Sequence, residues 1–317
     1  MTLPADILGN PMRADANIAG ELAELVSPAT VIRHDEPLAK HTTLRVGGPA
    51  DIYVEPASEA DLAAVVKFCN ARGVSFIVIG RGSNLLVRDG GFRGAVVCLS
   101  HADFSKIEIG VGHLRCGAGA KLKNVAIEAR CHGLSGLEFL EGIPGSVGGA
   151  LRMNAGAMGG QTFDVVEFVR VMNFEGDVQE LVPKEMAVKY RGCDTLKNHI
   201  ALGAVLKGRA DSPESIAQRM SAFSQKRWAS QPAAPSAGCA FKNPPSIPAG
   251  KLIDELGLKG VRVGGAVVSQ EHGNFIVNDG NATARDVLEL IALLQAKAKA
   301  ARGIELHTEV EIIGEDC

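Results

Sequence analysis

Residues 133–160 read GLSGLEFLEGIPGSVGGALRMNAGAMGG, and this stretch says more about the fold than any other part of the chain. Between residues 142 and 160, seven of the 19 positions are glycine. Because glycine loses more backbone entropy on folding than any other residue, such a density requires a reason. The usual reason is close approach of backbone amides to an anionic or planar ligand. We therefore interpret the stretch as a loop that lies against a cofactor.

A flexible linker is the alternative interpretation of a glycine-rich segment. Linkers of that kind carry serine and few large apolar residues. Here Leu137, Phe139, Ile143 and Val147 stand among the glycines, and side chains of these types are usually buried. The composition favours a ligand cradle over a linker.

The composition of the whole chain excludes several classes of protein. The 317 residues carry a net charge of −3 and are 46% hydrophobic, which predicts two or three globular domains and argues against a nucleic-acid or membrane surface. The N-terminal sequence MTLPADILGNPMRADANIAG lacks a basic start followed by an apolar core, so we expect no signal peptide. Seven scattered cysteines without a C-x-x-C pair suit a reducing cytoplasm and offer no metal-ligand spacing, so we predict a cytoplasmic protein without a metal site.

The hydrophobic pattern predicts helices and strands in mixed order. Helices are expected over 58–72, 120–132, 212–228 and 283–303, and strands over 74–79, 94–99, much of 165–206 and 304–314. We place domain boundaries near residues 100 and 210. The predicted parts are 1–100, 101–210 and 211–317.

Five further segments carry candidate chemistry, each with an ordinary structural alternative. The loop Gly80-Arg81-Gly82-Ser83-Asn84 follows a strand and could hold a pyrophosphate, or could be a simple tight turn. It runs on into Leu85, so it does not match the glycine pattern of the classical dinucleotide-binding fold. HTTLRVGGPAD, residues 41–51, suits a turn beneath a nucleotide or an ordinary strand turn.

The other three segments contain the remaining reactive side chains. Tyr190-Arg191 could be plain surface charge. Cys239, between small residues, could be a packed thiol or a thiol held open beside cations. In the terminal strand, alternation puts Glu305, His307, Glu309 and Glu311 on one face, where the pattern alone selects no carboxylate.

Taken in order, these segments resemble one family, UDP-N-acetylenolpyruvoylglucosamine reductase, also called UDP-N-acetylmuramate dehydrogenase. The resemblance runs from about residue 31 to 314 and rests on HTTLRVGGPAD, GRGSNLLV, GLEFLEGIPGSVGGALRMNAGA, KYR, GCAFKNP, AGKLIDELGLKG and IELHTEVEIIG. The direct run from KYRGC to IALGAVL resembles the shorter class of the family, which lacks an extra substrate-covering loop.

The resemblance implies an α+β fold, with an FAD-binding domain of the vanillyl-alcohol-oxidase type in two subdomains and a C-terminal α+β substrate domain. It implies non-covalent FAD, NADPH as hydride donor, and reduction of UDP-N-acetylenolpyruvoylglucosamine to UDP-N-acetylmuramate for peptidoglycan. We expect a monomer that acts on small molecules. The implied cofactor residues are Gly80, Arg81, Gly82, Ser83, Asn84, Gly142, Ile143, Gly145, Ser146, Gly148, Gly149, Asn154 and Ala155.

The same resemblance implies the catalytic and substrate-binding residues. Arg191 and Glu309 match positions that stabilise the enolate-like charge developed by hydride addition, a role that suits fixed polar groups. Tyr190, Lys242, Asn243 and Lys251 are the candidate substrate residues, and Lys259 and Arg262 are further cations in the same domain.

The chain departs from the common pattern of the family at one catalytic position. Cys239 stands where many members have serine. With an ordinary pKa of about 8.5, a thiol is a stronger acid than an aliphatic hydroxyl, so we predict that Cys239 donates the proton. Two alternatives are an FAD-linked oxidase or dehydrogenase of an alcohol or hydroxy acid, and an inactive nucleotide-binding relative.

Overall fold

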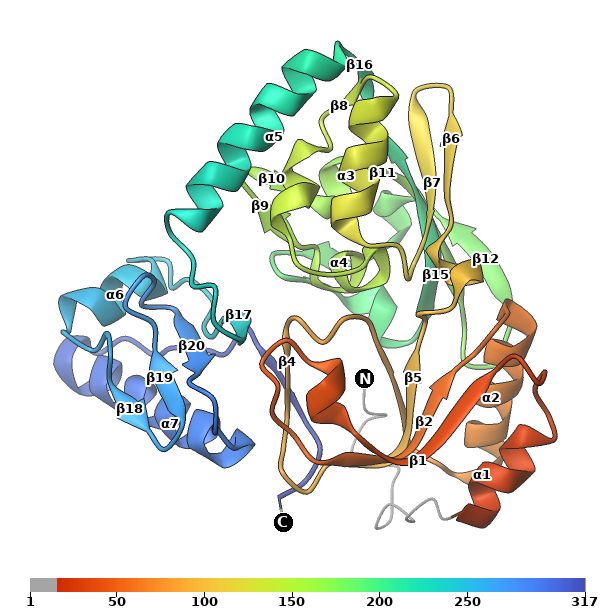
Figure 1. Ribbon diagram of the computed structural model, residues 1–317, viewed down its shortest axis with the longest axis horizontal. Coiled ribbons are helices and arrows are strands. Elements are labelled where there is room, and N and C mark those ends of the chain that lie inside the picture. Colours follow the sequence, from red (N-terminus) through yellow and green to blue (C-terminus); the bar gives the residue numbers. More distant parts are fainter. Residues whose placement is uncertain (1–15, 317) are drawn as a thin grey trace. The chain divides into compact units, whose positions relative to one another are not determined.

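The computed structural model describes residues 16–316, and its contacts divide the chain into two units built from discontinuous segments (Figure 1). Unit 1 comprises the chain up to Asp35, Asp51–Arg81 and Arg93–Gln225. Unit 2 comprises Glu36–Ala50, Gly82–Phe92 and the chain from Lys226 onward. The three-part division at residues 100 and 210 stays a prediction. The expectation about a signal peptide concerns residues 1–15 above all, which lie outside the described residues, as does Cys317.

One sheet of unit 1 has the strand order β1-β2-β5-β3. Its strands are β1 (Val31–Pro37), β2 (Pro49–Glu55), β5 (Phe92–Cys98) and β3 (Phe76–Ile79). Helix α2 (Glu59–Arg72) buries Leu62, Val65 and Val66 in the same core as this sheet. As predicted, α2 begins after Ser58, whose hydroxyl accepts from Asp61 N at 3.1 Å, and ends at Gly73 in a left-handed conformation.

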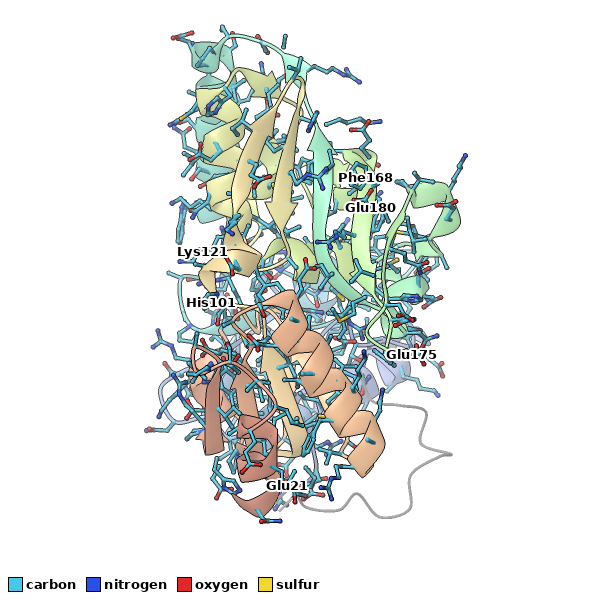
Figure 2. All side chains as sticks on the ribbon, turned by 90° about the vertical axis from the view of Figure 1, so that its right-hand side faces the viewer. Glu21, His101, Lys121, Phe168, Glu175 and Glu180 are labelled. Carbon is cyan, nitrogen blue, oxygen red and sulfur yellow. The ribbon has the colours of Figure 1, made fainter. Side chains whose placement is uncertain are left out.

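The second large sheet of unit 1 has the order β12-β11-β15-β7-β6, with every neighbour pair antiparallel. Its strands are β12 (Val178–Leu181), β11 (Val166–Met172), β15 (Ile200–Lys207), β7 (His113–Gly117) and β6 (Ile107–Gly110). The helices that share its core are α3 (Leu122–Cys131), α4 (Val147–Met153) and α5 (Pro213–Trp228). Phe168 and Glu180 lie near each other on this sheet (Figure 2). The exposed Arg115 guanidinium lies 5.3 Å from the Phe168 ring and 3.8 Å from the Glu180 carboxylate.

Unit 2 is built on a sheet of order β17-β20-β19-β18 and two helices. The elements are β17 (Ser236–Cys239), β18 (Arg262–Val263), β19 (Ala266–Val268), β20 (Phe275–Asn278), α6 (Ala249–Glu255) and α7 (Ala284–Arg302). As predicted, α7 starts with a reciprocal capping box between Thr283 and Asp286. The parallel pair β4 (Leu85–Val87) and β21 (Glu311–Ile313) completes the unit and brings Leu86 into its core.

The remaining elements are short. They are α1 (Ala16–Ala23), β8 (Leu134–Ser135), β9 (Gly156–Ala157), β10 (Gly160–Gln161), β13 (Val188–Lys189), β14 (Gly192–Cys193) and β16 (Arg209–Ala210). The 3-10 turns are η1 (Leu38–His41), η2 (Ala102–Ser105), η3 (Glu138–Gly142), η4 (Thr162–Asp164), η5 (Pro183–Glu185) and η6 (Asp194–Lys197). Within residues 16–316, no helix has the length and apolar character needed to cross a membrane.

Two local expectations were wrong. The glycine-rich stretch is not a continuous loop, because Val147–Met153 forms the helix α4 within it. The strand expected over 304–314 is also shorter, since only Glu311–Ile313 forms a ladder. The segment before it makes an isolated bridge between Thr308 and Phe241, after which the chain turns to a different partner, β4. A change of partner interrupts the regular hydrogen bonding that defines a strand.

Candidate active site

A pocket lies within unit 1, along strand β3. Its lining comes from both sheets of the unit and from α4: residues 76–80, Leu99, Ala118, Gly119, Ser146, Gly148, Gly149, Arg152, Phe174, Leu196 and residues 199–201. Phe76 and Phe174 meet edge to face, with ring centroids 5.2 Å apart. An apolar pocket with a few polar groups is the usual form of a cofactor site.

The end of β3 and the start of α4 approach each other closely at this pocket. A Cβ at Gly80 would lie 2.6 Å from Ser146 Oγ, so any larger residue would displace that hydroxyl. The N–H groups of Val147 and Gly148 donate to Ala120 O and Ala118 O at 3.0 and 2.8 Å, which holds the start of α4 against the end of β7. A Cβ at Gly149, by contrast, would have no protein atom closer than 3.8 Å. The missing side chain of Gly149 therefore leaves open space on the pocket wall.

Two basic side chains in the pocket lining were absent from the predicted site. Arg152 Nη1 donates to Leu196 O at 2.9 Å. His199 Nδ1 lies 3.1 Å from Thr195 O and its Nε2 lies 3.3 Å from Gln179 Nε2, which together assign the Nδ1–H tautomer to the neutral ring. Arg152 belongs to the quoted glycine-rich stretch and could have been included. His199 has no local signal, because it reaches the pocket only through the pairing of β15 with its neighbours.

Of the thirteen predicted cofactor residues, only Gly80, Ser146, Gly148 and Gly149 line this pocket. The others lie outside its lining: Arg81, Gly82, Ser83, Asn84, Gly142, Ile143, Gly145, Asn154 and Ala155. The border between the two units falls inside the predicted pyrophosphate loop, between Arg81 and Gly82. The cofactor roles of all thirteen residues stay predictions.

Tyr190 and Arg191 form the two-residue turn of the β13–β14 hairpin in unit 1. Arg191 has a φ of 55°, which is unusual for a residue other than glycine. Its guanidinium lies 5.1 Å from the Tyr190 ring, and a Cβ at Gly156 would lie 3.4 Å from Arg191 Nη1. The hairpin is clamped by Lys189 Nζ, which donates to Asp194 Oδ2 at 2.7 Å. Hydrogen bonds from Lys189 and Lys197 lower the pKa of Asp194 to about 2, so this clamp stays charged at neutral pH.

Cys239 and Glu309 lie close together along the backbone of unit 2. Phe241 forms a bridge with Thr308, and Glu309 N donates to Ala240 O at 2.8 Å. The carbonyl group of Glu309 is held by Asn84, whose Nδ2 donates to Glu309 O at 3.1 Å. The structure thus brings three predicted residues together: Asn84 from the predicted pyrophosphate loop, Cys239 and Glu309.

The surroundings of Cys239 differ from those of the packed thiols. Burial raises the pKa of Cys69 and of Cys116 to about 12, which makes these two thiols unreactive at neutral pH. Cys239 is half-buried and follows Gly238, whose φ is 76°. Its exposure excludes the interpretation of a fully packed core thiol.

The predicted substrate residues of unit 2 differ in how their side chains are engaged. Asn243 Oδ1 accepts from Ala249 N at 3.0 Å, at the start of α6. Lys251 is exposed and lies 3.8 Å from the Glu255 carboxylate. The two other cations considered, Lys259 and Arg262, form ion pairs with Asp254 and Asp279. Lys242 has no carboxylate partner among the described residues, and its backbone N–H donates to His307 O at 2.9 Å.

Comparison with known families assigns both halves of the chain. Residues 50–181 match the model of an FAD binding domain. Residues 231–313 match the model described as UDP-N-acetylenolpyruvoylglucosamine reductase, C-terminal domain. Among solved structures, the chain is similar to the crystal structure of UDP-N-acetylenolpyruvylglucosamine reductase from Thermus caldophilus. That similarity has a TM-score of 0.78 and 40% identity, over 89% of this chain and 98% of the other.

Curated relatives agree with this assignment. A UDP-N-acetylenolpyruvoylglucosamine reductase from Syntrophomonas wolfei is 42% identical over 91% of this chain and 97% of its own length. One from Bacillus licheniformis is 44% identical over 90% of this chain and 94% of its own length. These findings confirm the predicted α+β fold with an FAD-binding domain and a C-terminal substrate domain. The chain is an oxidoreductase and belongs to the UDP-N-acetylenolpyruvoylglucosamine reductase family of peptidoglycan precursor synthesis.

Proposed function

We propose that the protein catalyses the NADPH-dependent reduction of UDP-N-acetylenolpyruvoylglucosamine to UDP-N-acetylmuramate in the cytoplasm, and so serves cell wall biogenesis, cell shape and cell division. The single observation that carries the assignment of chemistry is the hydrogen bond from Glu309 N to Ala240 O. This bond places the backbone of Glu309 beside Ala240, the residue that follows Cys239, in a chain whose relatives are named for this reduction.

The residues of the unit 1 pocket fit the adenosine-diphosphate half of FAD. Gly149 leaves open space on the wall, Ser146 Oγ faces Gly80, and Arg152 supplies a positive charge for a diphosphate. Phe76 and Phe174 provide apolar surface for a planar ring. When bound, the cofactor supplies hydride transfer between NADPH and the terminal methylene carbon of the enolpyruvyl group.

Arg191 and Glu309 stabilise the negative charge that hydride addition pushes into the substrate carboxylate. A guanidinium donates paired hydrogen bonds to such a group, and the hairpin turn holds it before the reaction begins. Glu309 must be protonated to donate a hydrogen bond, or else it orients a neighbouring group. Arg191 and Glu309 are held in position before the reaction begins, so neither side chain has to reorient as charge develops in the transition state.

Cys239 donates the proton that completes the reduction. Hydride adds to the terminal carbon, and the thiol proton goes to the adjacent carbon, which restores the substrate carboxylate. The resulting thiolate regains a proton from solvent, which its partial exposure permits. A half-buried thiol is suited to this role because it is both accessible and more acidic than a serine hydroxyl.

Lys242 is the strongest candidate to hold the UDP diphosphate, because the other unit 2 cations considered lie beside carboxylates. A lysine that is already paired must give up that partner before it binds a phosphate. Tyr190 is an exposed aromatic ring beside Arg191, and it is suited to substrate contact. The Asn243 Oδ1 atom already accepts a hydrogen bond from Ala249 N at the start of α6, so Asn243 would both bind substrate and stabilise this helix end.

Stopped-flow absorbance of the flavin tests the proposal on the purified protein. NADPH is added without oxygen, followed by UDP-N-acetylenolpyruvoylglucosamine. Bleaching by NADPH and recovery on substrate would support both half-reactions. Bleaching without recovery would overturn the substrate assignment, and recovery with the oxidised form of an alcohol or hydroxy acid would favour the alternative enzyme. Failure to take up FAD would overturn the cofactor assignment.

A further inference from the structure

Asn154 terminates helix α4 in a conformation that few residues adopt. Its φ and ψ are 40° and 53°, in the left-handed region, where asparagine is one of the better-tolerated residues after glycine. Only 5% of the residue is exposed. A polar side chain in this position must find its partners inside the protein.

The side-chain amide of Asn154 connects three segments of unit 1. Its Nδ2 donates to Gln161 Oε1 at 3.1 Å and to Lys189 O at 3.3 Å. Its Oδ1 accepts from Phe163 N at 3.2 Å. Both donor hydrogens and the acceptor are therefore engaged within the protein. The side chain joins the end of α4 to β10, η4 and β13.

The contact with Lys189 is the one that bears on chemistry. Lys189 is the last residue of β13 and directly precedes the Tyr190–Arg191 turn. The left-handed backbone of Arg191 is unfavourable for a non-glycine residue, so surrounding contacts must hold it in place. The Asn154 bond restrains the carbonyl just before the turn, while the Lys189–Asp194 ion pair restrains the hairpin from its side chains.

We propose that Asn154 is a positioning residue for Arg191, acting through Lys189 O, rather than a direct ligand of the cofactor. The inference rests on the proposed function of Arg191. The proposal also explains why residue 154 is asparagine. The position requires a left-handed backbone together with a small side chain that has two donor hydrogens and one acceptor oxygen. Glycine has the backbone without the amide, and aspartate has the shape without the donors.

Asn154→Asp removes the Lys189 contact selectively. The Gln161 amide can rotate to donate to a carboxylate, and Phe163 N can still donate, but Lys189 O cannot donate to anything. Asn124→Asp is the matched control, because it makes the same charge change at an exposed position of α3 in the same unit. Asn154→Gly is the second variant should Asn154→Asp not fold, since it keeps the left-handed backbone and loses only the amide.

The expected result is a split between the two half-reactions. Asn154→Asp should bind FAD and be reduced by NADPH like the wild type, whereas reoxidation by substrate should slow by about 10–10²-fold, the cost of a misplaced catalytic group. In an Arg191→Ala background the same substitution should change reoxidation by no more than about twofold, because its effect passes through the missing side chain. Asn124→Asp should change neither step.

Three results would overturn the inference. The first is that both Asn154 variants are reoxidised as fast as Asn124→Asp. The second is that Asn154→Asp slows reoxidation by the same factor in the wild type and in the Arg191→Ala background. The third is that Asn154→Asp loses FAD affinity together with its reoxidation rate. If the wild type itself is not reoxidised by substrate, the proposed function fails instead. In that case crystal structures of the two variants decide the inference. The Arg191 guanidinium should move away from Gly156 in Asn154→Asp and stay beside it in Asn124→Asp. An Arg191 side chain that has not moved in Asn154→Asp would overturn the inference.

Discussion

At the scale of single residues, Arg191 combines an unusual backbone with a specific place. Its φ is 55°, and its Nη1 lies 3.4 Å from the position of a Cβ at Gly156, so the guanidinium packs beside the backbone of that glycine. We predict that Arg191→Ala retains FAD and lowers turnover by about 10²–10³, the cost typical of losing one charge-stabilising donor. Steady-state turnover and flavin content measure this. Arg115→Ala, on the solvent side of the β11–β15 sheet, is the control, and turnover of Arg191→Ala near that of the control would remove Arg191 from the mechanism.

Cys239 provides the second prediction at this scale. Cys239→Ala should be reduced by NADPH normally and stall in the second half-reaction, because no acidic proton remains at that position. Cys239→Ser should recover part of the rate. Rapid-mixing measurements of both half-reactions check this, with Cys131→Ala as the control for an exposed thiol on α3. Normal turnover by Cys239→Ala would show that the proton comes from another group.

At the scale of elements, helix α4 forms part of the wall of the proposed cofactor pocket, and its glycines affect both helix stability and the shape of that pocket. Alanine is favoured over glycine in a helix by about 0.5–1 kcal/mol, so Gly149→Ala should leave the protein without FAD as stable as before or more so. Its methyl group would extend into the open space on the pocket wall. We predict a rise in the FAD Kd of about tenfold, or about 1.4 kcal/mol, measured by titration of the apoprotein.

Gly20→Ala is the matched control for this prediction. Gly20 also lies in a helix of unit 1, α1, and a Cβ there would have no neighbour within 4 Å. Both variants should therefore show a similar change in the free energy of unfolding, and only Gly149→Ala should lose FAD affinity. Equal FAD affinities in the two variants would place the cofactor elsewhere.

At the scale of the whole molecule, the discontinuous units determine which fragments can fold. Fragment 211–317 lacks Leu44, Val46 and Leu86, which are at most 3% exposed and belong to the core of unit 2. Burial of each such side chain contributes about 1.5–3 kcal/mol, and whole domains are stable by only about 5–15 kcal/mol. The fragment should show no cooperative thermal unfolding by circular dichroism, whereas the full chain should. A cooperative transition in the fragment would contradict the assignment of these segments to unit 2.

The sequence by itself determined the features that depend on near neighbours along the chain. Ser58 and Gly73 mark the ends of α2, Thr283 and Gly303 mark those of α7, and these caps are local hydrogen bonds between residues a few positions apart. The order of the motifs was likewise sufficient to indicate the family, because it requires no coordinates. The cofactor and catalytic residues taken from those motifs are still predictions.

Only the tertiary structure decided what depends on pairing across long separations. His199 joins the pocket because β15 pairs with β7, some ninety positions earlier in the chain. The terminal strand was shortened because Thr308 and Glu311 have different partners, and Asn154 reaches Lys189 across the fold of unit 1. Periodicity reports which face of an element is buried but carries no information about the partner that buries it. The physical reason is that such contacts arise from packing of the whole chain, where local preference is overridden by burial and by hydrogen bonds between distant segments.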